Sequence, residues 1–199
     1  FINAVTKEGA TLCYIAVDEN RQLAYGANYH KGEVNVYKIN EDGSLTASDA
    51  IFHQEATGPH ANQDNPHVHF TDLTPDGRLV VCDLGTDGVY TYDVSTEGKL
   101  TRVALFQATP GTGPRHLVFH PDGQHAYIFG ELANTVTVAA YDATTGAFTH
   151  VQTISTLPED FTEFSGGAAI RISKDGRFLY ASNRGHNSLA VFAVNDAGA

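Results

Sequence analysis

The sequence predicts an all-β protein of the β-propeller class, and three observations carry this prediction. Four segments of the chain repeat in one register, each contains short runs of β-forming residues, and none shows the sustained 3.6-residue period of a helix. Val, Ile, Tyr, Phe and Thr dominate the runs, and Asp-Gly or Asn-rich pairs separate them. Units of roughly 50 residues built as up-and-down meanders are typical of propeller blades, which hold about four strands each.

The repeats align at a tight turn that precedes a strand, a polar turn and a second strand. They read DENRQLAYGANYHKGEVNVYKI, PDGRLVVCDLGTDGVYTYDV, PDGQHAYIFGELANTVTVAAYD and KDGRFLYASNRGHNSLAVFAV. The aligned turn positions, which lie 57, 46 and 53 residues apart, are Asn20, Gly77, Gly123 and Gly176. The strand after each turn is expected to close at Asn28, Asp83, Gly130 and Asn183, and the next to open at Val34, Val89, Val136 and Leu189. Glycine suits such turns because it adopts positive φ at low steric cost.

We expect residues 1–199 to form one incomplete propeller domain with about four blades. The chain begins at Phe1, contains no methionine and stops just after a strand pair, so we interpret it as part of a larger ring. Open blade edges would favour self-association with another chain.

Composition and charge disfavour some classes of binding partner. The chain carries 12 basic and 23 acidic residues, a net charge of −11, and no basic block, which disfavours nucleic acid and anionic membranes as partners. A small anionic ligand remains possible, because solvent and salt screen distant charges over ~8–10 Å and a few arginines can dominate locally. No apolar run approaches the ~20 residues that span a bilayer. Cys13 and Cys82 lie in apolar runs, and we expect two buried free thiols.

The repeat register places four chemically complementary side chains at one end of the expected channel. In a meander, the start of each first strand and the end of each second strand share a face, opposite the Asp-Gly turns. The first-strand position holds Leu12, His69, Arg115 and Ala168, and the second-strand position holds Tyr29, Leu84, Glu131 and Arg184. We therefore predict a site made from His69, Arg115, Glu131 and Arg184.

Three neighbouring histidines, His67, His116 and His186, are predicted to contact the substrate. His67 and His69 alternate in NPHVHF, so both side chains are expected to face the same way. Such a pair could bind metal only with further ligands, for which His53 and His60 are the candidates, and we expect no metal and no cofactor. Each predicted site residue also has a structural interpretation, as a strand-end histidine satisfied by the backbone or as a blade-to-blade salt bridge.

The chain resembles a known family in PHVHFTDLTPDGRLVVCDLGTDGVYTYD, GTGPRHLVFHPDGQHAYIFGELANTVTV and IRISKDGRFLYASNRGHNSLAVF. These segments look like the lactonase-type seven-bladed propellers, which include cycloisomerase-like 6-phosphogluconolactonases of bacteria and carboxymuconate lactonising enzymes of fungi. The strings G-P-R-H-L and S-N-R-G-H are the most specific. The resemblance implies a site of one histidine, two arginines and one glutamate, which fall on His69, Arg115, Glu131 and Arg184. It also implies a glutamate near Ala169, which AAIRIS lacks.

The reaction implied by the resemblance is hydrolysis of 6-phosphoglucono-δ-lactone, a small anionic sugar lactone, to 6-phosphogluconate in the pentose phosphate pathway of the cytoplasm. In this hypothesis His69 is the general base, and an unperturbed imidazole pKa of about 6.5 suits that role. Arg115 and Arg184 would neutralise the phosphate or the developing oxyanion. Glu131 would orient an arginine or the histidine, or assist protonation of the departing ring oxygen.

Two other functions stay open from the sequence. A lactonising cycloisomerase acting on an unsaturated dicarboxylate would use a similar arginine-rich pocket and a proton donor. A non-catalytic propeller would bind a partner through its rim loops, and then the four site residues would not matter.

Overall fold

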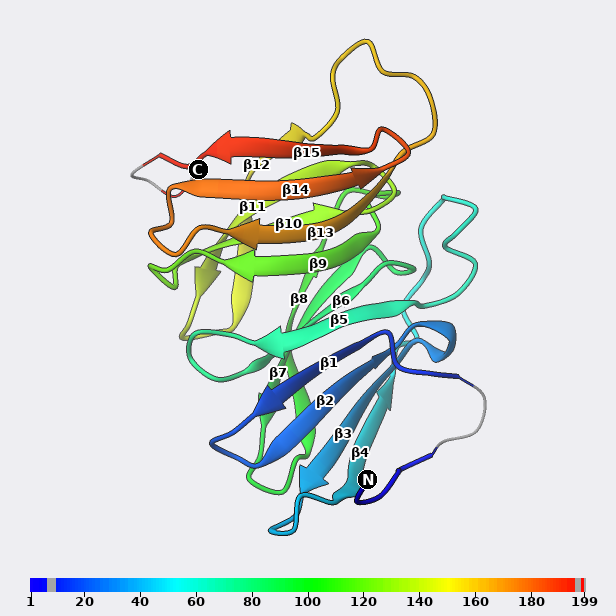
Figure 1. Cartoon of the computed structure of the whole chain (residues 1–199), viewed down its shortest axis with the longest axis vertical. Coiled ribbons are helices and arrows are strands. Elements are labelled where there is room, and N and C mark those ends of the chain that lie inside the picture. The colour runs from blue at the N-terminus through cyan, green and yellow to red at the C-terminus, as the bar shows by residue number, and fades with distance from the viewer. Residues whose placement is uncertain (7–9, 196–197, 199) are drawn as a thin grey trace.

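Four antiparallel sheets follow one another along the chain, as the repeat predicts (Figure 1). The structure is a computed structural model and describes residues 1–6, 10–195 and 198. The first two sheets consist of β1 (Tyr14–Asp18), β2 (Leu23–Asn28), β3 (Glu33–Ile39) and β4 (Leu45–Phe52), then β5 (Val68–Leu73), β6 (Leu79–Asp83), β7 (Gly88–Val94) and β8 (Leu100–Gln107). The others consist of β9 (Pro114–Phe119), β10 (His125–Gly130), β11 (Thr135–Asp142) and β12 (Ala147–Ser155), then β13 (Gly166–Ile172), β14 (Phe178–Arg184) and β15 (Ser188–Ala193).

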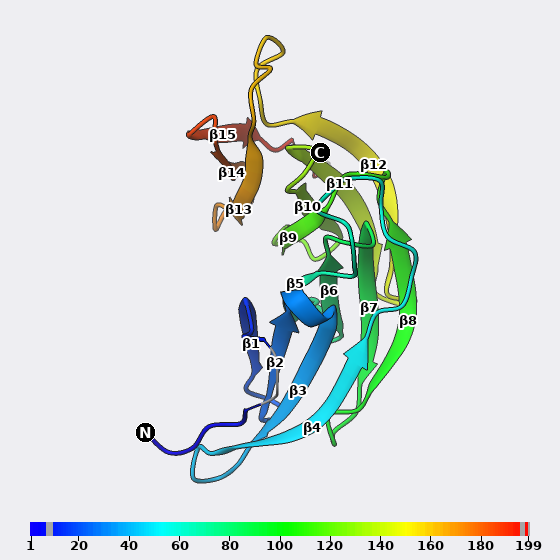
Figure 2. The same ribbon diagram turned by 90° about the vertical axis from the view of Figure 1, so that its right-hand side faces the viewer.

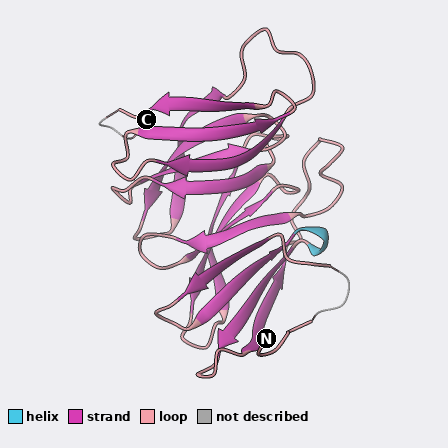
Figure 3. Ribbon diagram, in the orientation of Figure 1, coloured by secondary structure: helices cyan, strands magenta, loops and turns pink. Residues whose placement is uncertain are grey.

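The sheets stand side by side along an arc, as blades of a propeller do (Figure 2). The first strands β1, β5, β9 and β13 lie on the concave side and pack against one another in sequence, whereas β4, β8 and β12 lie on the convex side. Apart from one 3₁₀ turn at Tyr29–Lys31, the described residues contain only strands and loops (Figure 3). Accordingly, the part of the chain that the structure describes has no helix with the length and apolar character needed to cross a membrane.

Three apolar cores fill the spaces between neighbouring sheets. In β6, Leu79 and Val81 face the core shared with the first sheet, whereas Val80 and Cys82 face the core shared with the third. Successive side chains of a strand point to opposite faces, so a strand between two sheets buries both sets. This explains why the strands of the interior blades read as continuous apolar runs.

The outer sheets show the opposite pattern, because a neighbouring sheet covers only one of their faces. On β15, Leu189 and Val191 are 58% and 55% exposed, whereas Phe192 packs against the core between the third and fourth sheets. On β1, Ile15 and Val17 are 60% and 54% exposed. The self-association expected from open blade edges stays a prediction.

The tight turns confirm most of the repeat register. Gly77, Gly123 and Gly176 have φ of +86°, +71° and +75°, in the left-handed region that favours glycine. The first blade differs from the prediction, since its left-handed residue is Gln22 and not Asn20. The reason is a shorter turn, in which Asp18 pairs directly with Leu23.

The prediction of two buried free thiols is half right. Both cysteines are free, and Cys82 is fully buried in the core between the second and third sheets. Cys13 is exposed, in contrast to the prediction, because it lies in the segment before β1; its Sγ nevertheless contacts the backbone carbonyls of Val68 and His69 in the second sheet, at 3.6 and 3.5 Å.

Candidate functional site

The four predicted catalytic residues come from three adjacent blades and lie at the same end of these blades. His69 is near the start of β5 and Arg115 near the start of β9. Glu131 follows β10 directly, and Arg184 is the last residue of β14, one position later in its strand than predicted. Four residues that are far apart in the sequence are therefore neighbours in the structure, because they hold equivalent positions in the repeat.

A carboxylate bridges the two arginines. Glu131 Oε2 lies 2.9 Å from Arg115 Nε, and its Oε1 lies 2.7 Å from Arg184 Nη2. Two backbone carbonyls complete the arrangement: Arg115 Nη1 donates to the oxygen of Ala168 at 2.7 Å, and Arg184 Nη2 donates to that of Gly167 at 2.9 Å. We call Arg115, Glu131 and Arg184 the arginine cluster.

The arginine cluster is suited to hold an anion. Two guanidinium groups against one carboxylate leave one net positive charge, and the side chains of Arg115 and Glu131 are only 16% and 19% exposed. Burial lowers the pKa of Arg115, and the negative charge of Glu131 opposes this shift. The guanidinium of Arg115 therefore stays charged. The Arg184 side chain is 53% exposed and presents its guanidinium to solvent. An incoming anion would meet a fixed charge with little water around it.

Two histidines lie next to this cluster and are held neutral. The rings of His69 and His116 are 5.3 Å apart. Burial lowers the pKa of His69 to about 4 and that of His116 to about 3, and the Arg115 charge adds to both shifts. The expectation of an unperturbed His69 pKa is therefore wrong, because the side chain is desolvated beside a cation. At neutral pH both imidazoles are unprotonated.

His116 lies beside the arginine cluster in a buried position, and its predicted contact with the substrate stays a prediction. Its ring packs against Tyr14 and Phe70 at 5.3 Å each, and its Nε2 lies 3.3 Å from Arg115 Nη1. The Nδ1 atoms of His69 and His116 are buried without a hydrogen-bond partner among the described residues.

The other two predicted substrate-binding histidines have structural partners. His67 precedes β5, and its ring stacks on Tyr29 at 4.2 Å; its Nδ1 donates to the Tyr29 carbonyl and its Nε2 lies 2.8 Å from Asp64. His186 lies in the turn after β14, with Nδ1 2.6 Å from the Ser188 hydroxyl. Both ring nitrogens of His67 are thus occupied, and a substrate contact from either histidine stays a prediction.

Sequence reasoning did not single out Tyr29. It meets the His69 ring edge-on at 5.8 Å, and burial together with the Glu131 charge raises the pKa of its phenol. The available signal was its register, because Tyr29 follows β2 as Glu131 follows β10.

The described residues hold no group of three or more histidine, cysteine, aspartate or glutamate side chains that could bind a metal ion. Of the two further candidates weighed from the sequence, His53 is occupied by Asp83 at 2.6 Å and by the Tyr92 hydroxyl at 2.8 Å. His60 instead lies in the loop before β5, where its Nδ1 accepts from the backbone of Asn62.

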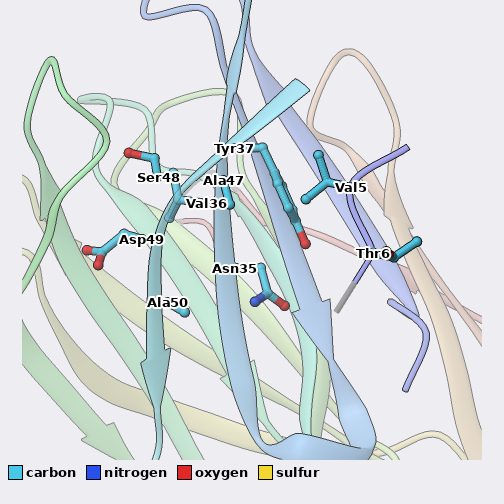
Figure 4. A pocket seen from close by; sticks show the side chains of 9 residues that line it. All are labelled: Val5, Thr6, Asn35, Val36, Tyr37, Ala47, Ser48, Asp49 and Ala50. Atoms are coloured by element: carbon cyan, nitrogen blue, oxygen red, sulfur yellow. The ribbon is translucent and has the colours of Figure 1, made fainter. Parts of the chain in front are cut away.

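Two cavities in the described part of the chain differ in whether a predicted site residue lines them. Figure 4 shows a cavity of about 340 Å³ against β3 and β4, lined by Val5, Tyr37 and Asp49 among others, and none of the predicted site residues lines it. Asp49 there accepts hydrogen bonds from Lys99 and from the backbone of Leu100 in the second blade, so it has a structural partner. A smaller cavity of about 240 Å³ borders Glu131.

Comparisons with known proteins show which family the chain is similar to. A family model described as "Lactonase, 7-bladed beta-propeller" matches residues 1–199. A 6-phosphogluconolactonase of Bacillus subtilis is 43% identical over 196 residues, which cover 98% of this chain and 56% of that protein. An uncharacterized protein of Lactococcus lactis subsp. cremoris is 59% identical over 194 residues, 98% of this chain and 57% of that protein.

Solved structures give the same result. A crystal structure of a protein from Lactobacillus plantarum superimposes with a TM-score of 0.97 and 52% identity, covering 99% of this chain and 57% of that one. The periplasmic gluconolactonase of Pseudomonas aeruginosa has a TM-score of 0.88 and 34% identity, over 94% of this chain and 55% of that one. The chain thus spans little more than half the length of the relatives it matches.

Proposed function

Because the chain belongs to the seven-bladed β-propeller lactonase family, we propose that the protein hydrolyses 6-phosphoglucono-δ-lactone to 6-phosphogluconate. The single observation that supports this best is the arginine cluster beside the neutral imidazole of His69. An anion-binding group next to an unprotonated base is what hydrolysis of an anionic ester requires.

The proposed reaction consumes one water molecule. The His69 imidazole accepts a proton as the water oxygen forms a bond to the lactone carbonyl carbon, and the carbonyl oxygen becomes an oxyanion. When the oxyanion collapses, the bond from this carbon to the ring oxygen breaks. The ring oxygen takes the proton back from the imidazolium, which gives an open-chain acid and restores the base.

The arginines have separable tasks in this mechanism. Arg115 is buried and fixed by Glu131 and by the Ala168 carbonyl, so it is suited to stabilise the oxyanion without reorganising. Arg184 is half-exposed and is suited to meet the phosphate first. Glu131 orients both guanidinium groups.

His69 acts as a base despite its low pKa. A pKa of about 4 keeps nearly all of the imidazole unprotonated at neutral pH, although it makes the base weaker than an ordinary histidine. A bound anionic substrate and the developing oxyanion both favour the charged imidazolium, so they raise this pKa during the reaction.

A lactonising cycloisomerase is the second candidate, and the same observation favours it. A neutral imidazole beside paired arginines could move a proton next to a carboxylate of an unsaturated dicarboxylate. The difference is that this reaction consumes no water. With the hydrolytic reaction we also propose a role in the pentose phosphate pathway and a location in the cytoplasm.

The test measures acid release from fresh 6-phosphogluconolactone at neutral pH, above the spontaneous rate, with the full-length protein. We expect His69→Ala to lower kcat/KM by ~10²–10⁴, the usual cost of removing a general base. His150→Ala is the control, because His150 is an exposed histidine on β12, on the convex side. A His69→Ala rate within threefold of wild type would refute the base assignment. No wild-type rate above background, together with lactone formation from a carboxymuconate, would support the cycloisomerase.

A further inference from the structure

A second cavity borders Glu131. The cavity of about 240 Å³ is walled by three segments: the loop before β5, the turn between β10 and β11, and the loop before β13. Its lining residues are His60, Asn62, Glu131, Leu132, Asn134 and Glu163 to Gly166. Its volume equals the share of about eight water molecules in the liquid, so it suits one part of a small substrate.

Two buried polar atoms in the wall of this cavity have no partner in the described part of the chain. They are Asn134 Oδ1 and Ser165 Oγ, on side chains that are 6% and 9% exposed. An unpartnered buried polar atom destabilises the folded state, commonly by ~1–3 kcal/mol, so native proteins retain few of them. Both atoms belong to residues that line the cavity, so a small rotation of either side chain would bring its oxygen to a hydroxyl group of a bound ligand.

The wall that carries these atoms is fixed in place. Asn134 Nδ2 donates to the Ser165 carbonyl at 2.8 Å, which leaves Oδ1 as the free end of that amide. Gly185 in the next turn has φ of +99°, and a Cβ there would lie 2.2 Å from the Phe164 carbonyl, so the two segments are packed backbone to backbone. The cavity is therefore preorganised on this side.

The rim combines an exposed aromatic ring with acceptor groups. Phe164 is 83% exposed and lines the cavity, next to the exposed carboxylate of Glu163. A flat apolar ring suits the C–H face of a sugar, and carboxylate and amide oxygens accept from its hydroxyls. Glu131 is already neutralised by its two arginines, so the exposed carboxylate of Glu163 is the group that disfavours a phosphate at this rim, and the arginine cluster attracts it instead.

We propose that this cavity binds the neutral, hydroxyl-bearing part of the sugar while the arginine cluster holds its anionic part. This inference rests on the proposed function, and it adds a specificity site made by Asn134, Phe164 and Ser165. Glu131 lies between the cavity and the two arginines, because it lines the cavity and also pairs with both guanidinium groups. The substrate is thereby oriented along one direction, with its reacting carbonyl beside His69.

The test compares two probes, 6-phosphogluconate and inorganic phosphate, by calorimetric titration of the full-length protein. In wild type, 6-phosphogluconate binds more tightly than phosphate. We expect Phe164→Ala and Ser165→Ala each to weaken 6-phosphogluconate binding about tenfold, close to the value of one hydrogen bond or ring contact, and to leave phosphate binding unchanged. Ser48→Ala and Phe52→Ala on β4 are the matched controls and leave both affinities unchanged.

Stability separates a binding role from a structural one. Ser165→Ala removes an unpartnered buried hydroxyl, so its melting temperature stays equal to wild type or rises while affinity falls. Unchanged 6-phosphogluconate binding in both variants, or an equal loss for the two probes, would overturn the proposal. Failure of the proposed function looks different, because wild type would then turn over no lactone whatever the variants bind.

Discussion

Arg115 donates a 2.7 Å hydrogen bond from Nη1 to the backbone carbonyl of Ala168, its register equivalent in the next blade. The two residues hold the same position near the start of β9 and β13, so the bond joins equivalent points of adjacent blades at the site. It also locks the guanidinium in one orientation. The anion-binding group is thus held by the propeller repeat itself.

Arg115→Lys should damage the site although it keeps the charge. Three nitrogen contacts depend on the shape of the guanidinium: Nε with Glu131, and Nη1 with both Ala168 and His116. One ammonium group cannot make all three. We expect kcat/KM to fall by ~10–100-fold in steady-state assays, and a loss below threefold would contradict this account. Arg102→Lys, at an exposed arginine paired with Glu55, is the control.

The pH dependence of activity should reflect the displaced pKa of His69. The neutral imidazole is the active form, and its pKa of about 4 means that it protonates only when the pH falls through this range. We expect kcat/KM to stay level from neutral pH downwards and to fall tenfold per pH unit below about 4. A decline centred near 6.5 would show that the histidine titrates normally and that its burial does not act as described.

Much of this arrangement could be predicted from the sequence because a repeat fixes register. Once the Asp-Gly turns are aligned, the pleat decides which residues start and end each strand, and Arg115, Glu131 and Arg184 follow. The ion pairs of Glu131 with the two arginines follow from these neighbouring positions. The glycine turns and the continuous apolar runs are local patterns, so they were predictable for the same reason.

Other features depend on contacts between distant segments and leave no local pattern. The low pKa of His69 requires burial beside Arg115, which the spacing of residues does not reveal. The stacking of His67 on Tyr29 joins two blades, and the burial of His116 between Tyr14 and Phe70 joins three. The cavity beside Glu131 is built from three loops, and loop conformation is the least repetitive part of the chain.

Glu131 and Arg184 should be energetically coupled. The carboxylate lies 2.7 Å from Arg184 Nη2, and it is the group that keeps the net charge of the arginine cluster at one. We expect Glu131→Gln and Arg184→Gln each to reduce kcat/KM, and the double variant to lose less than the product of the two effects. The coupling in such a cycle should amount to ~0.5–3 kcal/mol. Strictly multiplicative losses would show that the pair acts independently.

Two adjacent glycines in β13 should respond differently to the same added methyl group. A Cβ on Gly167 would lie 2.7 Å from the Phe129 ring and 2.9 Å from the Gly130 carbonyl, and both belong to the packed third blade. A Cβ on Gly166 would lie 3.4 Å from Arg184 Nη2 as its nearest contact, at the end of a flexible side chain.

Gly167→Ala should therefore lower the free energy of unfolding by ~1–3 kcal/mol, the usual cost of overpacking, as measured by urea denaturation of the full-length protein. Gly166→Ala should be nearly neutral for stability and should change only the affinity for ligands, through Arg184 and through the cavity that Gly166 lines. Because both substitutions reduce the entropy of the unfolded chain equally, the difference between them isolates packing in the folded state. Equal stability of the two variants would mean that β13 shifts to accommodate the methyl group, and that the contact between the third and fourth blades is looser than the structure shows.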